Sequence, residues 1–231
     1  MDAGMENSIR QEQIESFGRL MAGLAHDMKN HLGIIRESNG LMDDILAMGA
    51  SGEDAKMVER LQKSIAAIER RVVLSAKMMH HLSGLAHRTD SPLSSFLVNE
   101  LIEEEYTFLE RFSRLKQIGI TFELRDLLPA VYNDPSLLQH IFYRVYATCL
   151  DLLENQQKMT IATVQEGKNV VIVLTLPEGV PATDCEVFQE KKLLAAIDKI
   201  NGQLKVVEQG HMEVRLTVAS LPLGEQTSFN K

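Results

Sequence analysis

The hydrophobic residues in the first part of the chain recur at alternating steps of three and four. From about residue 10 to 48 there is no proline, and the repeat runs through Ile14, Phe17, Met21, Leu24, Met28, Ile35, Met42 and Ile45. This spacing predicts an amphipathic helix whose apolar stripe packs against other helices. His31 and Ser38 stand on the same stripe, so two polar residues interrupt it near its middle.

A second helical pattern follows a short polar segment. GASGED at 49–54 has the composition of a turn, with Ser51 and Asp54 at the spacing of a capping box. The same repeat then continues through Val58, Leu61, Ile65, Ile68, Val72, Ser75, Met79, Leu82 and Ala86. Two such helices alone leave much of both stripes in water, and a second copy would bury them in a dimeric four-helix bundle. Packing of both helices against the rest of the same chain is the alternative.

The pattern changes after TDSPLSS at 89–95, which has the composition of a linker. Helices are predicted at about 97–117, 136–154 and 186–200, the last ending at Asn201-Gly202. Strands are predicted at 120–124, 159–164, 170–176, 203–208 and 212–219. Helices interspersed with a mostly antiparallel sheet indicate an α+β sandwich. We therefore expect a helical hairpin over residues 1–90 and an α+β domain over 91–231.

Composition narrows the possible partners. The net charge of -8 opposes binding to nucleic acid or to anionic membrane surfaces, and the aromatic content of 5% disfavours platforms for stacked bases. Cys149 and Cys185 show no metal-site spacing, the N-terminus has no apolar signal region, and the apolar run at 170–176 is too short for a membrane span. The sequence predicts a cytoplasmic protein without bound metal, nucleic acid or membrane insertion.

One histidine of the first helix is predicted to face water. If Met21 and Met28 occupy one core position of the heptad repeat and Leu24 the other, His26 lies at the outermost position of the bundle. An exposed imidazole is a competent nucleophile, because one neutral ring nitrogen is available near neutral pH. A single exposed histidine is nevertheless more often an ordinary surface residue.

The neighbours of His26 suit phosphoryl chemistry. Asn30 lies four residues on and shares its face, while Asp27 and Lys29 flank it. Asp27 can hold the ring in one tautomer or accept its proton, and Asn30 can orient a phosphoryl oxygen or a water. Lys29 can neutralise phosphate charge. These four residues form the candidate catalytic group.

Small side chains gather near the same face of this helix. Ala22, Gly23 and Gly33 lie near His26, and Arg19 stands seven residues before it. Glycine lowers the stability of a helix by about 1 kcal/mol relative to alanine, so its presence on this face needs an explanation. Clearance for an approaching protein is one reason, and simple tolerance in a long helix is the other. Arg19, Ala22, Gly23 and Gly33 are therefore candidate docking residues.

The segment AHDMKNHLGII at 25–35 resembles the phosphoacceptor box of sensor histidine kinases. In that family a histidine is followed by an acidic residue and, four positions on, by an amide or threonine. The family's box lies on the first helix of a two-helix dimerisation domain. Here His31 replaces the proline that usually follows the amide. The resemblance implies that His26 carries a phosphoryl group.

The C-terminal half resembles the ATP-binding domain of the same family, without its ligands. Segment 128–154 is similar to the helix that carries the asparagines for magnesium and ATP phosphates, but Arg144 and Thr148 stand at those positions. PEGVPATD at 177–184 lacks the aspartate that should precede it, and only about ten residues separate Pro181 from the next helix, too few for a glycine-rich lid. The closing segment 202–222 still looks like the family's last strands. The expectation is a degenerate ATPase-like domain without a cofactor of its own.

Together these features predict a histidine phosphotransferase similar to the dimeric type of bacterial sporulation phosphorelays. His26 would exchange phosphate with the aspartate of a response-regulator receiver domain, which would bring its own magnesium, without autophosphorylation from ATP. Two alternatives stay open. One is a sensor histidine kinase or response-regulator phosphatase with an atypical nucleotide site, and the other is a non-catalytic dimeric scaffold.

Overall fold

A computed structural model describes residues 3–47, 55–88, 92–180, 187–208 and 210–221 of the 231-residue chain. They form two compact units, one of Arg19–Ser83 and one of Met1–Gly18 with Gly84–Lys231. The turn predicted at 49–54 lies outside the described residues. Among the helices that are described, none has the length and apolar character needed to cross a membrane.

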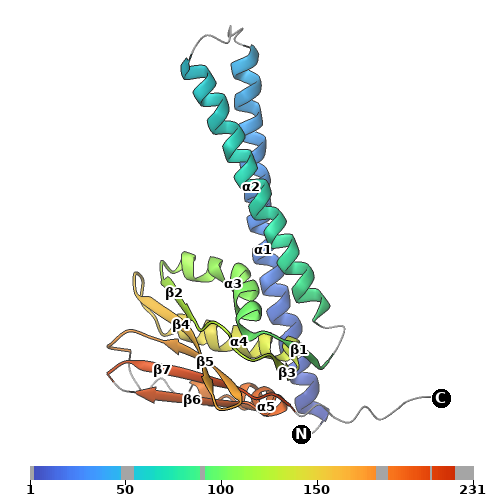
Figure 1. The fold of residues 1–231 in the computed structure, drawn as a ribbon, viewed down its shortest axis with the longest axis vertical. Helices are drawn as coiled ribbons and strands as arrows, with labels where there is room; N and C mark the ends of the chain where they lie inside the picture. Colours follow the sequence, from blue (N-terminus) through green and yellow to red (C-terminus); the bar gives the residue numbers. More distant parts are fainter. Residues whose placement is uncertain (1–2, 48–54, 89–91, 181–186, 209, 222–231) are drawn as a thin grey trace, which may run out of the picture. The chain divides into compact units, whose positions relative to one another are not determined.

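The unit Arg19–Ser83 is a hairpin made from the larger parts of two long helices, and Figure 1 shows them side by side. They are α1 (Ala3–Ala47) and α2 (Ala55–His87). The predicted start of α1 near residue 10 is wrong, because the helix continues toward the N-terminus through polar residues that carry no apolar repeat. Within Arg19–Ser83 the deeply buried apolar side chains are Leu20, Leu24, Ile45 and Met78.

The second unit contains a five-stranded sheet in the order β2-β4-β5-β7-β6. The strands are β2 (Gly119–Leu124), β4 (Lys158–Glu166), β5 (Asn169–Thr175), β6 (Gln203–Glu208) and β7 (Met212–Val218). Only β2 and β4 pair in parallel. This confirms the mostly antiparallel sheet that the sequence predicts.

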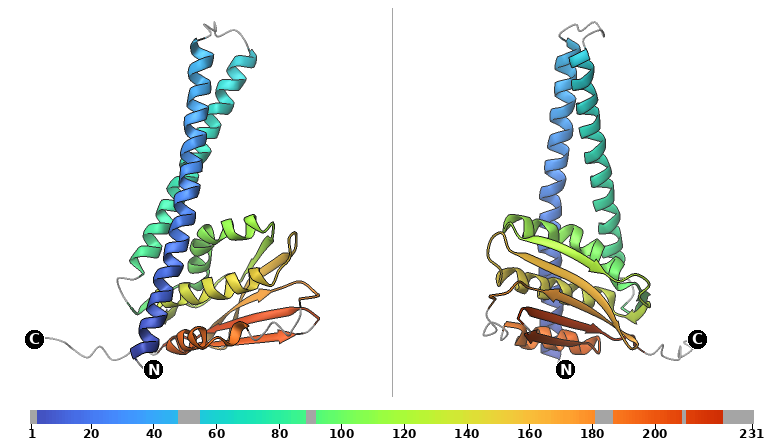
Figure 2. Two further views of the ribbon diagram at one scale, coloured as in Figure 1. Left: turned by 180° about the vertical axis from the view of Figure 1, so that it is seen from behind. Right: turned by 60° about the vertical axis from the view of Figure 1, so that its left-hand side comes forward.

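Three helices cover one face of this sheet (Figure 2). They are α3 (Val98–Leu115), α4 (Pro135–Asp151) and α5 (Lys191–Lys199). The central strand β5 is buried from Val170 to Leu174, and β7 alternates buried and half-buried side chains. Helix α4 lies between its two neighbours and is buried along most of its length. The observed α+β sandwich therefore has its core between the sheet and α4.

Two predicted boundaries are wrong in this unit. Residues 94 and 95, which the sequence assigned to a linker, belong to strand β1 (Ser94–Phe96), which pairs antiparallel with β3 (Val131–Asn133). Strands of three residues are too short to show an alternating pattern, so only the pairing reveals them. Helix α5 begins at Lys191 rather than near 186, because residues 187–189 form a 3₁₀ turn and Glu190 has extended backbone angles.

Two polar residues fix the start of α4. The Asp134 side chain accepts a hydrogen bond from the backbone N–H of Leu137 at 2.8 Å, and Pro135 is the first helical residue. The buried Asn133 amide donates to the backbone oxygens of Ile200 and Ala219, at 2.9 and 2.7 Å. These bonds tie the N-terminus of α4 to the end of α5, so the surfaces of the two helices are held in a fixed relation.

Candidate functional site

His26 lies in the middle of α1 with half of its side chain in water. Its side chain is 50% exposed, whereas Leu24, two residues earlier, is almost fully buried. The helical period places these two residues on different faces of α1, because successive residues are turned by 100°. The imidazole therefore has room for a reacting group while the helix is anchored from its other side.

Two neighbouring side chains meet the Nδ1 atom of His26. Asp27 Oδ1 lies 3.3 Å from Nδ1, and the Asn30 amide nitrogen lies 3.2 Å from the same atom. When Nδ1 carries the proton it donates to Asp27, and the lone pair is then on Nε2. When Nδ1 is unprotonated it accepts from Asn30 instead. The two partners thus select between the tautomers, and the one held by Asp27 leaves Nε2 as the nucleophile.

The other predicted site residues lie on exposed or half-exposed parts of α1. Lys29 is exposed, and within the described part of the chain it makes no hydrogen bond to His26, Asp27 or Asn30. Arg19 and Ala22 are exposed, and Gly23 and Gly33 are half-buried. The structure thus brings three of the four predicted catalytic residues into contact.

Packing within the chain does not require glycine at position 33. A Cβ atom added to Gly33 would meet nothing within 4 Å, and the same is true of Gly40. Space beside these positions is therefore left open by the fold of the single chain. Clearance for an approaching partner at Gly33 stays a prediction.

His31 has a different environment from His26. Its Nδ1 lies 3.0 Å from the hydroxyl of Ser75 on α2, and both residues are half-buried. Both were predicted on the apolar stripes of their helices, and the structure places both where α1 and α2 meet. A hydrogen bond between the stripes also fixes the register of α1 against α2.

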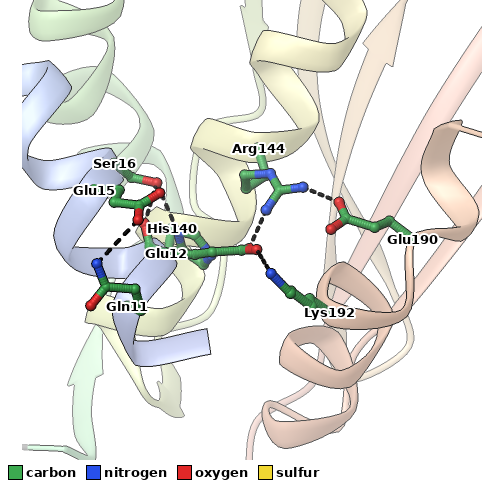
Figure 3. A network of polar contacts seen from close by, with 8 residues as sticks. All are labelled: Gln11, Glu12, Glu15, Ser16, His140, Arg144, Glu190 and Lys192. Atoms are coloured by element: carbon green, nitrogen blue, oxygen red, sulfur yellow. Dashed lines mark hydrogen bonds and ion pairs between the residues drawn. The ribbon is translucent and has the colours of Figure 1, made fainter. Parts of the chain in front are cut away.

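A second polar cluster surrounds Arg144 on α4, the residue at one of the expected asparagine positions. Figure 3 shows its guanidinium between two carboxylates, Glu12 of α1 and Glu190 at the start of α5. Lys192 donates to the second oxygen of Glu12 at 2.7 Å. The Ser16 hydroxyl and His140 Nδ1 are 3.1 Å apart. We call these six residues the Glu12 cluster.

The pattern of the sequence does not predict the Glu12 cluster. Its contacts join residues separated by 132 and 180 positions, and no local spacing in the sequence predicts such contacts. The single available signal was Arg144 itself, a charged residue on an otherwise buried helix. A cation at such a place needs an anion nearby, but the sequence does not show which one.

Burial and charge shift the pKa values of two members of the Glu12 cluster. Burial raises the pKa of Glu12, but the hydrogen bond from Lys192 and the charge of Arg144 outweigh it, so the pKa lies below its usual value. Burial, followed by the charge of Arg144, lowers the pKa of His140 from 6.5 to about 4. Glu12 is therefore ionised and His140 neutral at physiological pH.

The buried neutral His140 predicts a dependence of stability on pH. In the unfolded chain His140 binds a proton below about pH 6.5, whereas in the folded chain it does so only near pH 4. Its contribution to stability is complete above pH 6.5 and is lost as the pH falls toward 4. Between pH 7 and 5, wild type should lose about 2 kcal/mol of unfolding free energy relative to His140→Gln, measured by urea denaturation. Parallel pH profiles for the two proteins would contradict this.

Part of the expected nucleotide region lies outside the described residues. Pro181 and the rest of the segment to residue 184 belong to it, so the predicted loss of the glycine-rich lid stays a prediction. Thr148 lies half-buried on α4. Among the residues that are described, no group of three or more His, Cys, Asp or Glu side chains is placed to hold a metal ion.

The curated proteins that are similar to this chain in sequence are sensor histidine kinases. No model of a known protein family matches it. It is 24% identical over 166 residues to the sensor histidine kinase ZraS of Escherichia coli K12, covering 72% of this chain and 34% of ZraS. The ZraS of Salmonella typhi is 22% identical over 170 residues, covering 74% of this chain and 35% of that protein.

A solved structure agrees in fold. The histidine kinase ThkA, determined in complex with the response regulator TrrA, superposes with a TM-score of 0.50 at 14% identity, over 97% of this chain and 69% of that chain. The chain is therefore similar to sensor histidine kinases over part of their sequence and in its fold. It spans about a third of the length of the curated sensor kinases it matches. The mixed helical and sheet fold is that of a histidine kinase, as the resemblance of the sequence implied.

Proposed function

We propose that this chain is a histidine phosphotransferase, which accepts a phosphoryl group on His26 from the phosphoaspartate of a response-regulator receiver domain and returns it. The observation that carries the proposal is the half-exposed imidazole of His26, whose Nδ1 lies between Asp27 and Asn30. The similarity to sensor histidine kinases supports it, because the name of those proteins describes phosphoryl transfer that involves a histidine.

The three side chains have separate roles in this reaction. Asp27 accepts a hydrogen bond from the protonated Nδ1, so the lone pair of Nε2 attacks the phosphorus of the acyl phosphate. The bond from phosphorus to the aspartyl oxygen breaks, and the receiver's carboxylate leaves with that electron pair. The phosphorylated ring then carries a positive charge, which Asp27 stabilises through Nδ1–H. Asn30 orients a phosphoryl oxygen with its amide, and Lys29 adds positive charge nearby. Return of the phosphoryl group follows the same path in reverse.

The receiver domain would supply the magnesium and dock on α1. Phosphoryl transfer depends on positioning and on neutralising the phosphate oxygens, and the receiver's own metal meets the second need. Ala22 is exposed, a Cβ atom at Gly33 would meet nothing within 4 Å, Gly23 has no side chain, and exposed Arg19 offers a cation for an acidic partner. The complex of ThkA with a response regulator supports such a partner for this chain.

Transfer without ATP is the second part of the proposal. Arg144 stands where the family carries an asparagine, and its guanidinium is engaged by Glu12 and Glu190. A guanidinium cannot ligate magnesium, which requires oxygen ligands. We therefore propose that the C-terminal domain keeps the kinase fold as a pseudokinase and that phosphate reaches His26 only from a partner.

A homodimer is the third part. Four apolar side chains of α2 recur every seven residues and are 40–55% exposed in the single chain: Val58, Ile65, Val72 and Met79. The alternate positions of the same repeat, Leu61, Ile68, Ser75 and Leu82, are half-buried. One half of the stripe is thus covered and the other is not. A second copy would cover it and complete a four-helix bundle.

Two incubations test the source of the phosphate. Purified protein is mixed with labelled ATP and magnesium alone, and separately with a receiver domain that already carries labelled phosphate. We expect acid-labile, base-stable label on the protein only in the second mixture. Label from ATP alone would show that the C-terminal domain binds nucleotide and would leave the transfer chemistry of His26 intact.

That outcome would favour the second candidate, a sensor histidine kinase with an atypical nucleotide site. The observation on its side is that the named relatives are sensor kinases. Binding of labelled ATP measured by equilibrium dialysis separates the two. Affinity in the micromolar range supports a kinase, and its absence up to millimolar ATP supports the phosphotransferase.

A further inference from the structure

Two buried polar groups in the unit that contains the sheet have no hydrogen-bond partner among the described residues. They are the carboxyl group of Glu105 on α3 and the Nη1 atom of Arg88, the residue that follows α2. We propose that Arg88 has two alternative partners on α3, Glu104 near the surface and Glu105 in the interior, and that loss of a proton from Glu105 draws the guanidinium from the first to the second. This switch is independent of phosphoryl transfer at His26.

The present partner of Arg88 is Glu104. Nη2 of Arg88 donates to Oε2 of Glu104, and the two side chains are only 15% and 24% exposed. Gly84, one turn earlier on α2, leaves room for this pair. A Cβ atom added to Gly84 would lie 3.0 Å from the same Oε2 atom, closer than ordinary van der Waals contact. The Glu104 side chain therefore reaches Arg88 across a glycine.

Glu105 stands on the buried stripe of α3. Its side chain is fully buried, and neither oxygen has a hydrogen-bond partner among the described residues. The buried residues one turn to either side are all apolar: Leu101, Ile102, Phe108 and Leu109. Burial raises the pKa of Glu105 well above its usual value, and the positive charge of Arg88 offsets this only in part. The protonated form of Glu105 is therefore favoured while Arg88 is held by Glu104.

An ionised Glu105 needs a cation, and Arg88 is the charged residue whose field reaches it. The Nη1 atom of Arg88 is buried and brings N–H donors that no described residue accepts. A buried carboxylate without a partner is costly, whereas hydrogen bonds from a guanidinium to a carboxylate are strong. Loss of the proton therefore favours a turn of the guanidinium toward Glu105 and away from Glu104.

The other titratable groups on neighbouring elements can be separated from Glu105. Strand β2 packs against α3 and carries one acidic residue, Glu123, which is exposed. Helix α4 also packs against α3, and its buried titratable side chains are His140, Tyr143, Tyr146 and Cys149. The pKa of His140 is about 4, and burial raises the pKa values of Tyr146 and Cys149. His87 at the end of α2 is exposed, so its titration persists when Glu105 is replaced.

The switch lies where α2 passes from one compact unit to the other. The hairpin unit ends at Ser83, and Gly84 to Arg88 belong to the unit of α3. A change of partner at Arg88 therefore acts on the last turn of α2, the part of the chain that joins the two units.

The test is a pH titration of the full chain by NMR, which follows the carboxyl carbon of Glu105 and the Nε–H group of Arg88. In wild type both signals should change with one common midpoint. The change at Arg88 should be lost in Glu105→Gln, which also assigns the carboxyl signal. Glu105→Leu, which suits the apolar stripe, serves the same purpose if the glutamine variant does not fold.

Three further variants separate the switch from simple burial. Arg88→Gln should raise the pKa of Glu105, because it removes the nearby cation. Glu104→Gln should lower the pKa of Glu105 by about one unit, because Arg88 then has Glu105 as its remaining partner on α3. Glu103→Gln is the matched control, since Glu103 is exposed on the same helix, and it should leave both midpoints unchanged.

Amide hydrogen exchange gives a second readout at the end of α2. Exchange in residues 80–88 should differ between wild type and Glu105→Gln above the midpoint and coincide below it. An Arg88 signal that stays constant while Glu105 titrates would overturn the proposal. A midpoint of Glu105 at its ordinary value of 4.5 would overturn it as well.

Discussion

His26→Gln should take up no label from a phosphorylated receiver domain, whereas His31→Gln should be labelled as wild type is. Glutamine has no ring nitrogen that can attack phosphorus, and the nitrogen that contacts both Asp27 and Asn30 belongs to the ring of His26. His31 is the matched control because it lies on the same helix but is half-buried against Ser75. Autoradiography of the two variants, with wild type beside them, measures the effect.

The loss in His26→Gln would be chemical rather than structural. The His26 side chain is half-exposed, so its replacement should change the free energy of unfolding by less than about 0.5 kcal/mol. Thermal melts that coincide with wild type would establish this. Label on His26→Gln would identify another phosphoryl acceptor and contradict the assignment of His26 as the phosphoacceptor. Full biological output from an unlabelled His26→Gln protein would favour the non-catalytic scaffold.

The histidine site could be predicted because it is local. His26, Asp27 and Asn30 lie within five residues of one helix, and the helical period alone decides that residues four apart share a face. The apolar repeat then fixed which face is covered. The structure agrees, since His26 is half-exposed and Asn30 reaches its ring. No long-range information was needed at any step.

The features that the sequence did not predict depend on contacts between distant parts of the chain. Strand β1 exists only because residues 94–96 pair with residues 131–133, and no alternation can be read from three positions. The Glu12 cluster is similar, because Glu12 reads as an ordinary helix-surface residue until Arg144 and Lys192 meet it. The early start of α1 has a related cause. Its first turns bury one apolar side chain, Ile9, which is too little to create a repeat.

The double substitution Ile65→Glu with Val72→Glu should convert a dimer into a monomer. These side chains are 55% and 51% exposed in the single chain and lie on the uncovered stripe of α2. In a symmetric bundle each substitution occurs twice, so four carboxylates would enter an apolar interface without partners. At roughly 1 kcal/mol each or more, they should raise the dissociation constant about a thousandfold. Sedimentation equilibrium over a range of concentrations measures the change.

Gln62→Glu is the control for the added charge, because Gln62 is exposed on α2 and lies off the stripe. It should dimerise as wild type does. Circular dichroism of the monomeric double variant should show that the C-terminal domain is still folded, since its core does not include α2 residues 65 or 72. A wild type that is already monomeric, or a double variant that still dimerises, would mean that the stripe of Val58, Ile65, Val72 and Met79 is not the interface. A monomer with unchanged label on His26 would show that a single hairpin suffices for transfer, because His26, Asp27 and Asn30 all belong to one helix.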